Sequence, residues 1–144
     1  MLAAAAQAAA REPDAPLLLA VTVLTSMDGA ELAATGVNLP PGDQVDRLAK
    51  LAFSCGIPGL VASAEEVARL RSELGKQAVL VIPGIRPQGD AAGDQKRVAT
   101  PADAIAAGAS FLVVGRPITR AADPRAAATA ILDEMAAAIP SRQD

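Results

Sequence analysis

Residues 79–86 read Val-Leu-Val-Ile-Pro-Gly-Ile-Arg, and residues 111–116 read Phe-Leu-Val-Val-Gly-Arg. Each stretch is a short apolar run that ends in a glycine-containing turn with an arginine. The runs are typical of buried strands in a parallel sheet. Glycine lets backbone N–H groups approach a ligand, and arginine offers a planar fork of donors that matches a phosphate or carboxylate. Either arginine alone is equally consistent with a surface residue at a strand end, but two such turns on successive strands favour a phosphate site.

The segment between the two turns, residues 87–97, is polar and contains glycine. It is too long for a tight turn and has no helical periodicity. Loops of this kind are usually functional lids or disordered segments.

The rest of the chain alternates strand and helix around these turns. We expect strands over residues 17–24, 59–62, 78–82 and 110–114, and an opening helix that ends by residue 12. Further helices are predicted over residues 27–35, 44–54, 64–74, 101–107 and 124–138. Their expected N-caps are, in order, Thr25 or Ser26, Asp43, Ser63 with Glu66 in a capping box, Thr100 and Asp123. Strands and helices in alternation predict an α/β fold with parallel strands, and residues 1–144 show no internal domain boundary.

The amino-acid composition excludes several classes of function. The chain has a net charge of -3, is 51% hydrophobic and only 1% aromatic, which describes one soluble domain and argues against a nucleic-acid surface. The absence of histidine excludes Ser-His and Cys-His catalysis and histidine-ligated metals. Cys55 is the only cysteine, so an internal disulfide is impossible and a cytoplasmic location is expected. No apolar run is long enough to span a membrane, and the alanine-rich start lacks the basic region of a signal peptide.

The motifs around the two turns resemble a known family. The runs Pro83-Gly84-Ile85-Arg86-Pro87, Gly93-Asp94-Gln95, Thr100-Pro101 and Val114-Gly115-Arg116-Pro117-Ile118-Thr119 are similar to the C-terminal signature of orotidine 5'-phosphate decarboxylase. Residues 20–27 resemble a strand further upstream in the same family. Size alone favours a complete small open α/β sheet, because a full barrel needs at least about 200 residues. The resemblance implies instead the C-terminal half of a TIM (β/α)8 barrel, about four parallel βα units preceded by a helix, from a truncated or split enzyme.

The resemblance also implies roles for individual residues. Arg116, the backbone N–H of Gly115 and Gln95 would hold the substrate phosphate, Arg86 would contact the substrate, and Thr25 would hydrogen-bond the pyrimidine. Without the family, Gln95 is better explained as a solvated loop residue. Thr25 is equally consistent with a helix cap, and it can fill both roles because its hydroxyl and backbone are separate groups.

The reaction itself is not encoded in these residues. Members of the family convert orotidine 5'-monophosphate to UMP without metal or organic cofactor, using an Asp-x-Lys-x-x-Asp motif whose lysine is the proton donor. That motif does not occur here, and none of the three lysines, Lys50, Lys76 and Lys96, ends a predicted strand. We therefore predict no catalytic residue in this chain, which would be inactive alone.

Four other expectations concern function and association. The first alternative is a non-enzymatic nucleotide or phosphate binder, or a fragment without function. A phosphosugar decarboxylase or aldolase of similar barrel design is disfavoured by Gly93-Asp94-Gln95, the nucleotide-specific part of the resemblance. The resemblance implies a homodimer for the full-length enzyme. The apolar edge strands of a half-barrel predict dimers or aggregates of this chain.

Overall fold

A computed structural model describes residues 1–87 and 97–139. Its four strands form one parallel sheet in the order β1-β2-β3-β4. This is the predicted α/β arrangement, although β1 and β4 are shorter than the apolar runs suggested. The strands are β1 (Leu19–Val21), β2 (Gly59–Val61), β3 (Val79–Ile82) and β4 (Phe111–Leu112).

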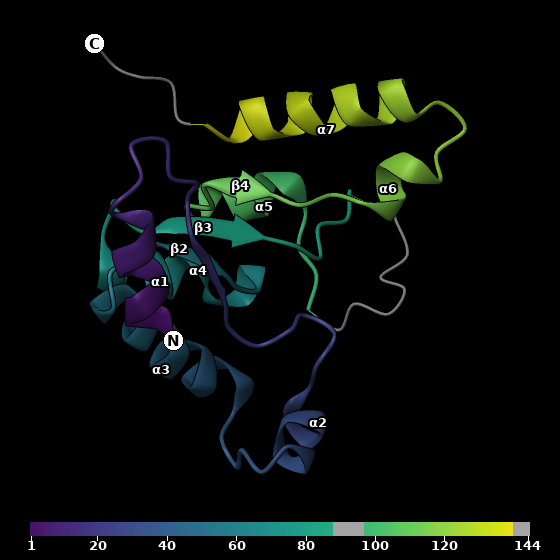
Figure 1. The fold of residues 1–144 in the computed structure, drawn as a ribbon. Helices are drawn as coiled ribbons and strands as arrows, with labels where there is room; N and C mark the ends of the chain where they lie inside the picture. Colours follow the sequence, from purple (N-terminus) through teal and green to yellow (C-terminus); the bar gives the residue numbers. More distant parts are fainter. Residues whose placement is uncertain (88–96, 140–144) are drawn as a thin grey trace.

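Helices connect the strands and flank the sheet (Figure 1). Every helix foreseen from the sequence is present, and a short one that was not foreseen, α6, follows β4. The helices are α1 (Leu2–Ala9), α2 (Gly29–Ala34), α3 (Pro41–Ser54), η1 (Ala64–Glu66, a 3-10 turn), α4 (Val67–Leu74), α5 (Pro101–Ala106), α6 (Arg116–Thr119) and α7 (Pro124–Ala138). None of the helices over residues 1–87 and 97–139 is long and apolar enough to cross a membrane.

Three of the predicted helix caps are confirmed. The Ser63 side chain accepts from the Glu65 N–H, while the Glu66 carboxylate accepts from the Ser63 N–H. Thr100 and Asp123 each accept a hydrogen bond from the N–H three residues on, and a proline follows each of them. These caps satisfy backbone donors that a helix start would otherwise leave without partners.

Two predicted caps are wrong. Helix α2 is capped by Asp28, not by Thr25 or Ser26, because Asp28 and Glu31 form a reciprocal capping box with N–H to carboxylate distances of 2.9 and 3.0 Å. Helix α3 begins at Pro41, so Asp43 lies inside its first turn. A proline at the first helical position has its φ already set for a helix, which moves the start ahead of the side-chain cap.

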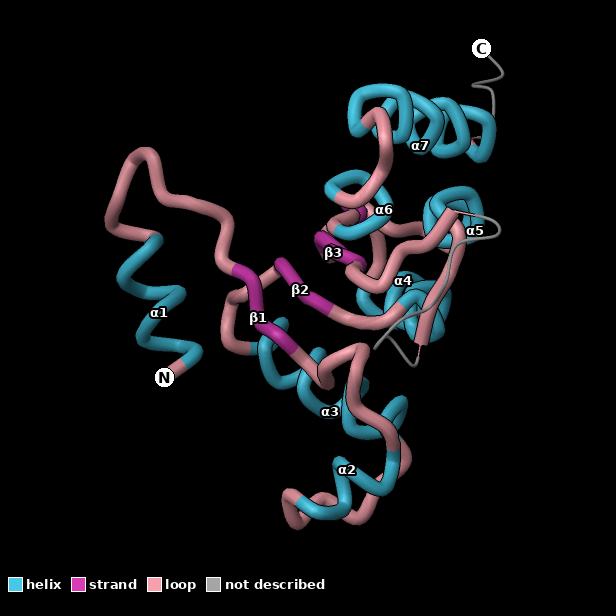
Figure 2. Tube along the Cα trace, turned by 90° about the vertical axis from the view of Figure 1, so that its right-hand side faces the viewer, coloured by secondary structure: helices cyan, strands magenta, loops and turns pink. Residues whose placement is uncertain are grey.

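One face of the sheet builds the core. Helices α3, α4 and α5 lie on the same side of the strands (Figure 2), and α7 packs against α5 and α6. Alternate strand residues point into this layer, and Leu80 and Ile82 of β3 are fully buried there. Other fully buried members of the core are Val45, Ala49, Leu60, Val67, Leu70, Ile85 and Ala104.

The other strand residues point to the opposite face, here called the open face. Val21, Val61, Val81 and Phe111 are paired in one row across all four strands. Val21 and Phe111, on the two edge strands, are each 58% exposed. The apolar runs had predicted a sheet covered on both faces, but within the described residues the edge strands keep one face exposed.

Arg71 ties the amino ends of β3 and β4 together. Its guanidinium donates to the carbonyl oxygens of Gly75, Ala78 and Gly108 at 2.8 to 3.1 Å. A further bond goes to the Ser110 hydroxyl, which itself accepts from the Leu80 N–H at 3.1 Å. One side chain on α4 therefore satisfies several backbone groups at the end of the sheet opposite to the predicted site.

Candidate functional site

The structure places four of the five predicted site residues at one edge of the sheet. Thr25 follows β1, Arg86 follows β3, and Gly115 with Arg116 follows β4. Because the four strands are parallel, these turns all extend from their carboxyl ends. Gln95, the fifth predicted residue, lies outside the described residues. In α/β barrels this edge is where function is located.

Thr25 lies beside a hollow. The residue is only 7% exposed, and its turn is closed by the bond from the Met27 N–H to the Leu24 carbonyl at 3.0 Å. The hollow has a volume of about 260 Å³ and is lined by residues from the ends of β1, β2 and β3: Val21, Val23, Leu24, Thr25, Ser26, Val61, Ala62 and Pro83. A hydroxyl at the edge of such an apolar hollow can both donate to and accept from a polar ring.

Arg86 is also buried and lies at the base of the long loop. Its backbone N–H donates to the Ala99 carbonyl at 2.9 Å, and Ile85 and Ala99 form an isolated parallel bridge. One guanidinium nitrogen of Arg86 donates to the Ile85 carbonyl at 2.7 Å. These contacts hold the two ends of the loop together at the carboxyl edge of the sheet.

Gly115 and Arg116 lie at the start of α6. Within residues 1–87 and 97–139, a Cβ on Gly115 would meet no atom within 4 Å. Arg116 is half-buried and begins α6, with Pro117 following. The sequence had predicted only a turn here, although Pro117 directly after Arg116 is a signal for the first turn of a short helix.

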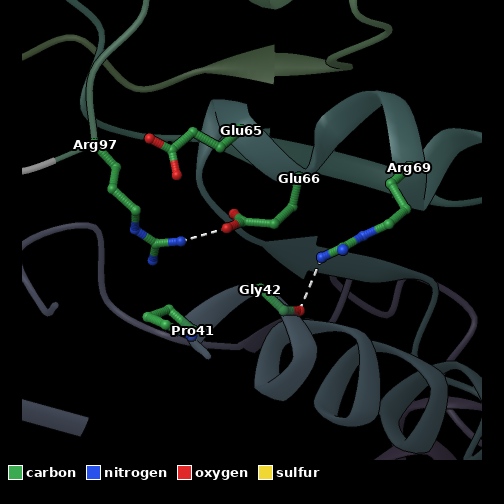
Figure 3. A pocket seen from close by; sticks show the side chains of 6 residues that line it. All are labelled: Pro41, Gly42, Glu65, Glu66, Arg69 and Arg97. Carbon is green, nitrogen blue, oxygen red and sulfur yellow. Dashed lines mark hydrogen bonds and ion pairs between the residues drawn. The ribbon is translucent and has the colours of Figure 1, made fainter. Parts of the chain in front are cut away.

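A buried ion pair that was not predicted from the sequence lies next to the turn before Thr25. Glu66 is 3% exposed, Arg97 is 8% exposed, and Arg97 Nη1 donates to Glu66 Oε1 (Figure 3). Both line a hollow of about 330 Å³ with Glu65, Arg69 and the start of α3. The capping box had singled out Glu66, but nothing in local sequence indicated that its second oxygen binds an arginine from a distant loop.

Burial dominates the electrostatics of this pair. It raises the pKa of Glu66 above its ordinary value of 4.5, and the neighbouring charge of Glu65 acts in the same direction. The positive charges of Arg97 and Arg69 and the Ser63 N–H lower that pKa, but by less. Desolvation of a carboxylate in an interior site is expected to outweigh a single ion pair.

A comparison of the sequence with models of known protein families shows which family the chain belongs to. A sequence model of the orotidine 5'-phosphate decarboxylase / HUMPS family matches residues 1–131. The chain belongs to this family. The resemblance inferred from the motifs around Arg86 and Arg116 is therefore confirmed, and at the family level the activity is that of a carboxy-lyase.

Curated relatives agree with this assignment. The chain is 60% identical over 123 residues to orotidine 5'-phosphate decarboxylase from Gluconobacter oxydans, a match that spans 85% of this chain and 52% of the relative. It is 60% identical over 121 residues to the enzyme of the same name from Rhodopseudomonas palustris, covering 84% of this chain and 52% of that one. The chain therefore spans about half the length of the curated relatives that it matches.

Solved structures confirm the fold. A crystal structure of orotidine 5'-phosphate decarboxylase from Lactobacillus acidophilus superimposes with a TM-score of 0.78 at 40% identity, covering 94% of this chain and 58% of that one. The enzyme from Pyrococcus horikoshii gives a TM-score of 0.61 at 27% identity over 85% of this chain and 52% of that one. The four βα units are thus half of a family barrel, and the small open sheet that size alone favoured is wrong.

Proposed function

We propose that this chain provides the phosphate- and pyrimidine-binding half of an orotidine 5'-phosphate decarboxylase. The reaction converts orotidine 5'-monophosphate to UMP and carbon dioxide in pyrimidine biosynthesis. Family membership supports the reaction class. The observation that carries the binding role is that Thr25, Arg86, Gly115 and Arg116 all follow the carboxyl ends of parallel strands in one sheet.

Each residue has a separate proposed role. Arg116 and the backbone N–H of Gly115 bind the phosphate together with Gln95, and Arg86 contacts the substrate at the base of the same loop. The Thr25 hydroxyl bonds the pyrimidine in the hollow beside it. A hydrogen bond to a charged group contributes roughly 1.5–3 kcal/mol, so an arginine, a glutamine and a backbone donor together can hold a phosphate firmly.

The proton donor for the decarboxylation would be a residue other than these proposed binding residues. The sequence contains no Asp-x-Lys-x-x-Asp. Lys50 pairs with Glu73 at 2.9 Å between α3 and α4, and Lys76 lies between α4 and β3, so both are away from the carboxyl ends of the strands. A general acid must reach the atom that it protonates, and neither lysine is placed to do so.

Titration of UMP into the chain, followed by calorimetry, tests the binding role. We expect saturable binding that Arg116→Ala weakens about tenfold to a hundredfold, because a charge-assisted bond to the phosphate is lost. Arg120→Ala is the matched control, since Arg120 follows the same short helix but is exposed. Equal effects of the two substitutions would contradict the assignment of Arg116.

The second candidate is a nucleotide or phosphate binder without catalytic activity. It is favoured by the absence of the Asp-x-Lys-x-x-Asp motif from the sequence. Binding of UMP by this chain is common to both candidates, so the two are separated by activity after an amino-terminal half-barrel is added. A folded chain that binds neither UMP nor orotidine 5'-monophosphate would contradict both.

A further inference from the structure

Arg97 joins three consecutive βα units at the carboxyl edge of the sheet. It belongs to the loop after β3, and its Nη1 donates to Glu66, which follows β2. Its Nη2 donates to the carbonyl oxygens of Val23 and Leu24, which follow β1, at 3.3 and 3.2 Å. The Arg97 side chain is almost completely buried, so these bonds form with little competition from water.

The two carbonyl groups are those directly before Thr25. The ladder between β1 and β2 reaches Thr22, whose N–H and hydroxyl both donate to the Val61 carbonyl at 3.1 and 2.8 Å. Beyond that point the chain leaves the sheet, and Arg97 binds the carbonyls of the next two residues. The turn that places Thr25 beside its hollow is thus held by a side chain from another βα unit.

We propose that Arg97, held by Glu66, is a positioning residue for nucleotide binding, because it fixes the turn that presents Thr25. The inference rests on the proposed function, since it assigns Arg97 to the same site. Arg97 acts through the backbone of Val23 and Leu24. Glu66 in turn is oriented by the Ser63 N–H, which donates to its other oxygen at 3.0 Å.

A lysine cannot replace this arrangement. The guanidinium is a planar fork whose two terminal nitrogens serve the carboxylate and the carbonyls at once, whereas an ammonium group is a single point. Arg97→Lys is therefore expected to keep the charge opposite Glu66 and to lose the bonds to the turn before Thr25.

Arg71 provides a matched control. It is also an arginine with several bonds to backbone carbonyls, but these lie at the amino ends of β3 and β4. Arg71→Lys is expected to lower stability in the same manner as Arg97→Lys. Within the part of the chain that the structure describes, the side-chain bonds of Arg71 go to Gly75, Ala78, Gly108 and Ser110 and not to the Thr25 turn.

A double-mutant cycle on UMP affinity tests the proposal in the full chain. Calorimetry gives Kd for the wild type, Thr25→Val, Arg97→Lys and the double variant. We expect Thr25→Val to weaken binding about threefold to tenfold in the wild type, the size of one neutral hydrogen bond, and to have almost no effect in the Arg97→Lys background. In the Arg71→Lys background, Thr25→Val should keep its full effect.

The outcomes separate this inference from the proposed function. If the wild type binds UMP and Arg116→Ala weakens that binding, but the effects of Thr25→Val and Arg97→Lys multiply, the positioning role is wrong and the proposed function stands. If the wild type does not bind UMP, both fail. Should Arg97→Lys not fold by circular dichroism, Glu66→Gln replaces it in the cycle, since it weakens the hold on Arg97 while keeping an acceptor for the Ser63 N–H.

Discussion

Glu66 is a buried carboxylate whose charge state affects the stability of this fold. It accepts bonds from the Ser63 N–H and from Arg97, and burial nevertheless raises its pKa above 4.5. The folded chain therefore binds the Glu66 proton more tightly than the unfolded chain does. By linkage, the stability that this group contributes is greatest at low pH and falls as pH rises from about 4.5 through the raised pKa.

Glu66→Gln tests the direction of this dependence. Because glutamine does not titrate, the stability of the wild type relative to Glu66→Gln should decrease as the pH rises from below 4.5 towards neutrality. Urea unfolding of both proteins across that range measures the difference. The charged groups facing Glu66, namely Glu65, Arg69 and Arg97, are the same in both proteins. A difference that stays constant or increases with pH would show that the Arg97 charge, and not burial, controls this pKa.

Gly59 permits a tight contact at the start of β2. A Cβ there would lie 2.4 Å from the Leu18 carbonyl oxygen and 2.5 Å from a methyl carbon of Leu19. Gly59→Ala should therefore lower the free energy of unfolding by about 1–3 kcal/mol, because the backbone of β1 must shift. Gly29→Ala is the control, since its new Cβ would meet its nearest neighbour at 3.8 Å. Equal urea midpoints for the two variants would contradict the contact.

At the scale of the elements, Arg71 and Arg69 differ in how much their side chains contribute to the free energy of unfolding. Both lie on α4, but Arg71 binds carbonyls before β3 and β4, whereas the exposed Arg69 binds the Gly42 carbonyl and Asp46. Arg71→Met should lower the unfolding free energy by about 2–4 kcal/mol, because several carbonyls lose a charged donor. Arg69→Met should cost less than about 1 kcal/mol, as expected for exposed pairs. Denaturant titrations that rank the two in the opposite order would be inconsistent with this assignment.

Most elements could be predicted from the sequence because their signals are local. The capping box of Ser63 and Glu66 and the Thr100-Pro101 and Asp123-Pro124 pairs each mark a helix start within four residues. The prediction failed at α2 and α3, where two start signals lie within a few residues of each other. At α2 the reciprocal capping box of Asp28 and Glu31 sets the start, and at α3 the proline at the first helical position does. Strand lengths were overestimated at β1 and β4, because an apolar run continues beyond the last ladder hydrogen bond.

The candidate site could be predicted only in part. The arginine turns and Thr25 follow from strand ends and from the family motifs, and these residues do lie at one edge of the sheet. Arg97 could not be found, because its partners Val23, Leu24 and Glu66 are distant in sequence and two of them take part through backbone carbonyls. Backbone acceptors have no signature in the sequence.

At the scale of the whole molecule, the open face is the apolar surface that the described residues leave exposed at the edge strands. Val21 and Phe111 are exposed on the two edge strands, and exposed apolar edges promote association. We expect sedimentation velocity to show dimers or larger species whose proportion rises with concentration, and Val21→Lys to shift the chain towards monomer. Leu132→Lys is the control, because Leu132 is similarly exposed on α7, away from the open face. A concentration-independent monomer for the wild type would contradict the expectation.

We propose that this chain binds the substrate and that an amino-terminal half of the barrel supplies the catalytic residues. A mixing experiment tests this most directly. The chain is combined with the amino-terminal half of the Gluconobacter oxydans relative, chosen to include the Asp-x-Lys-x-x-Asp motif implied by the family, and loss of orotidine 5'-monophosphate is followed. We expect decarboxylation only in the mixture, and much less of it when the chain carries Arg116→Ala. Decarboxylation by this chain alone, or none from a mixture that has folded and associated, would contradict the claim that these residues provide the binding half of the enzyme.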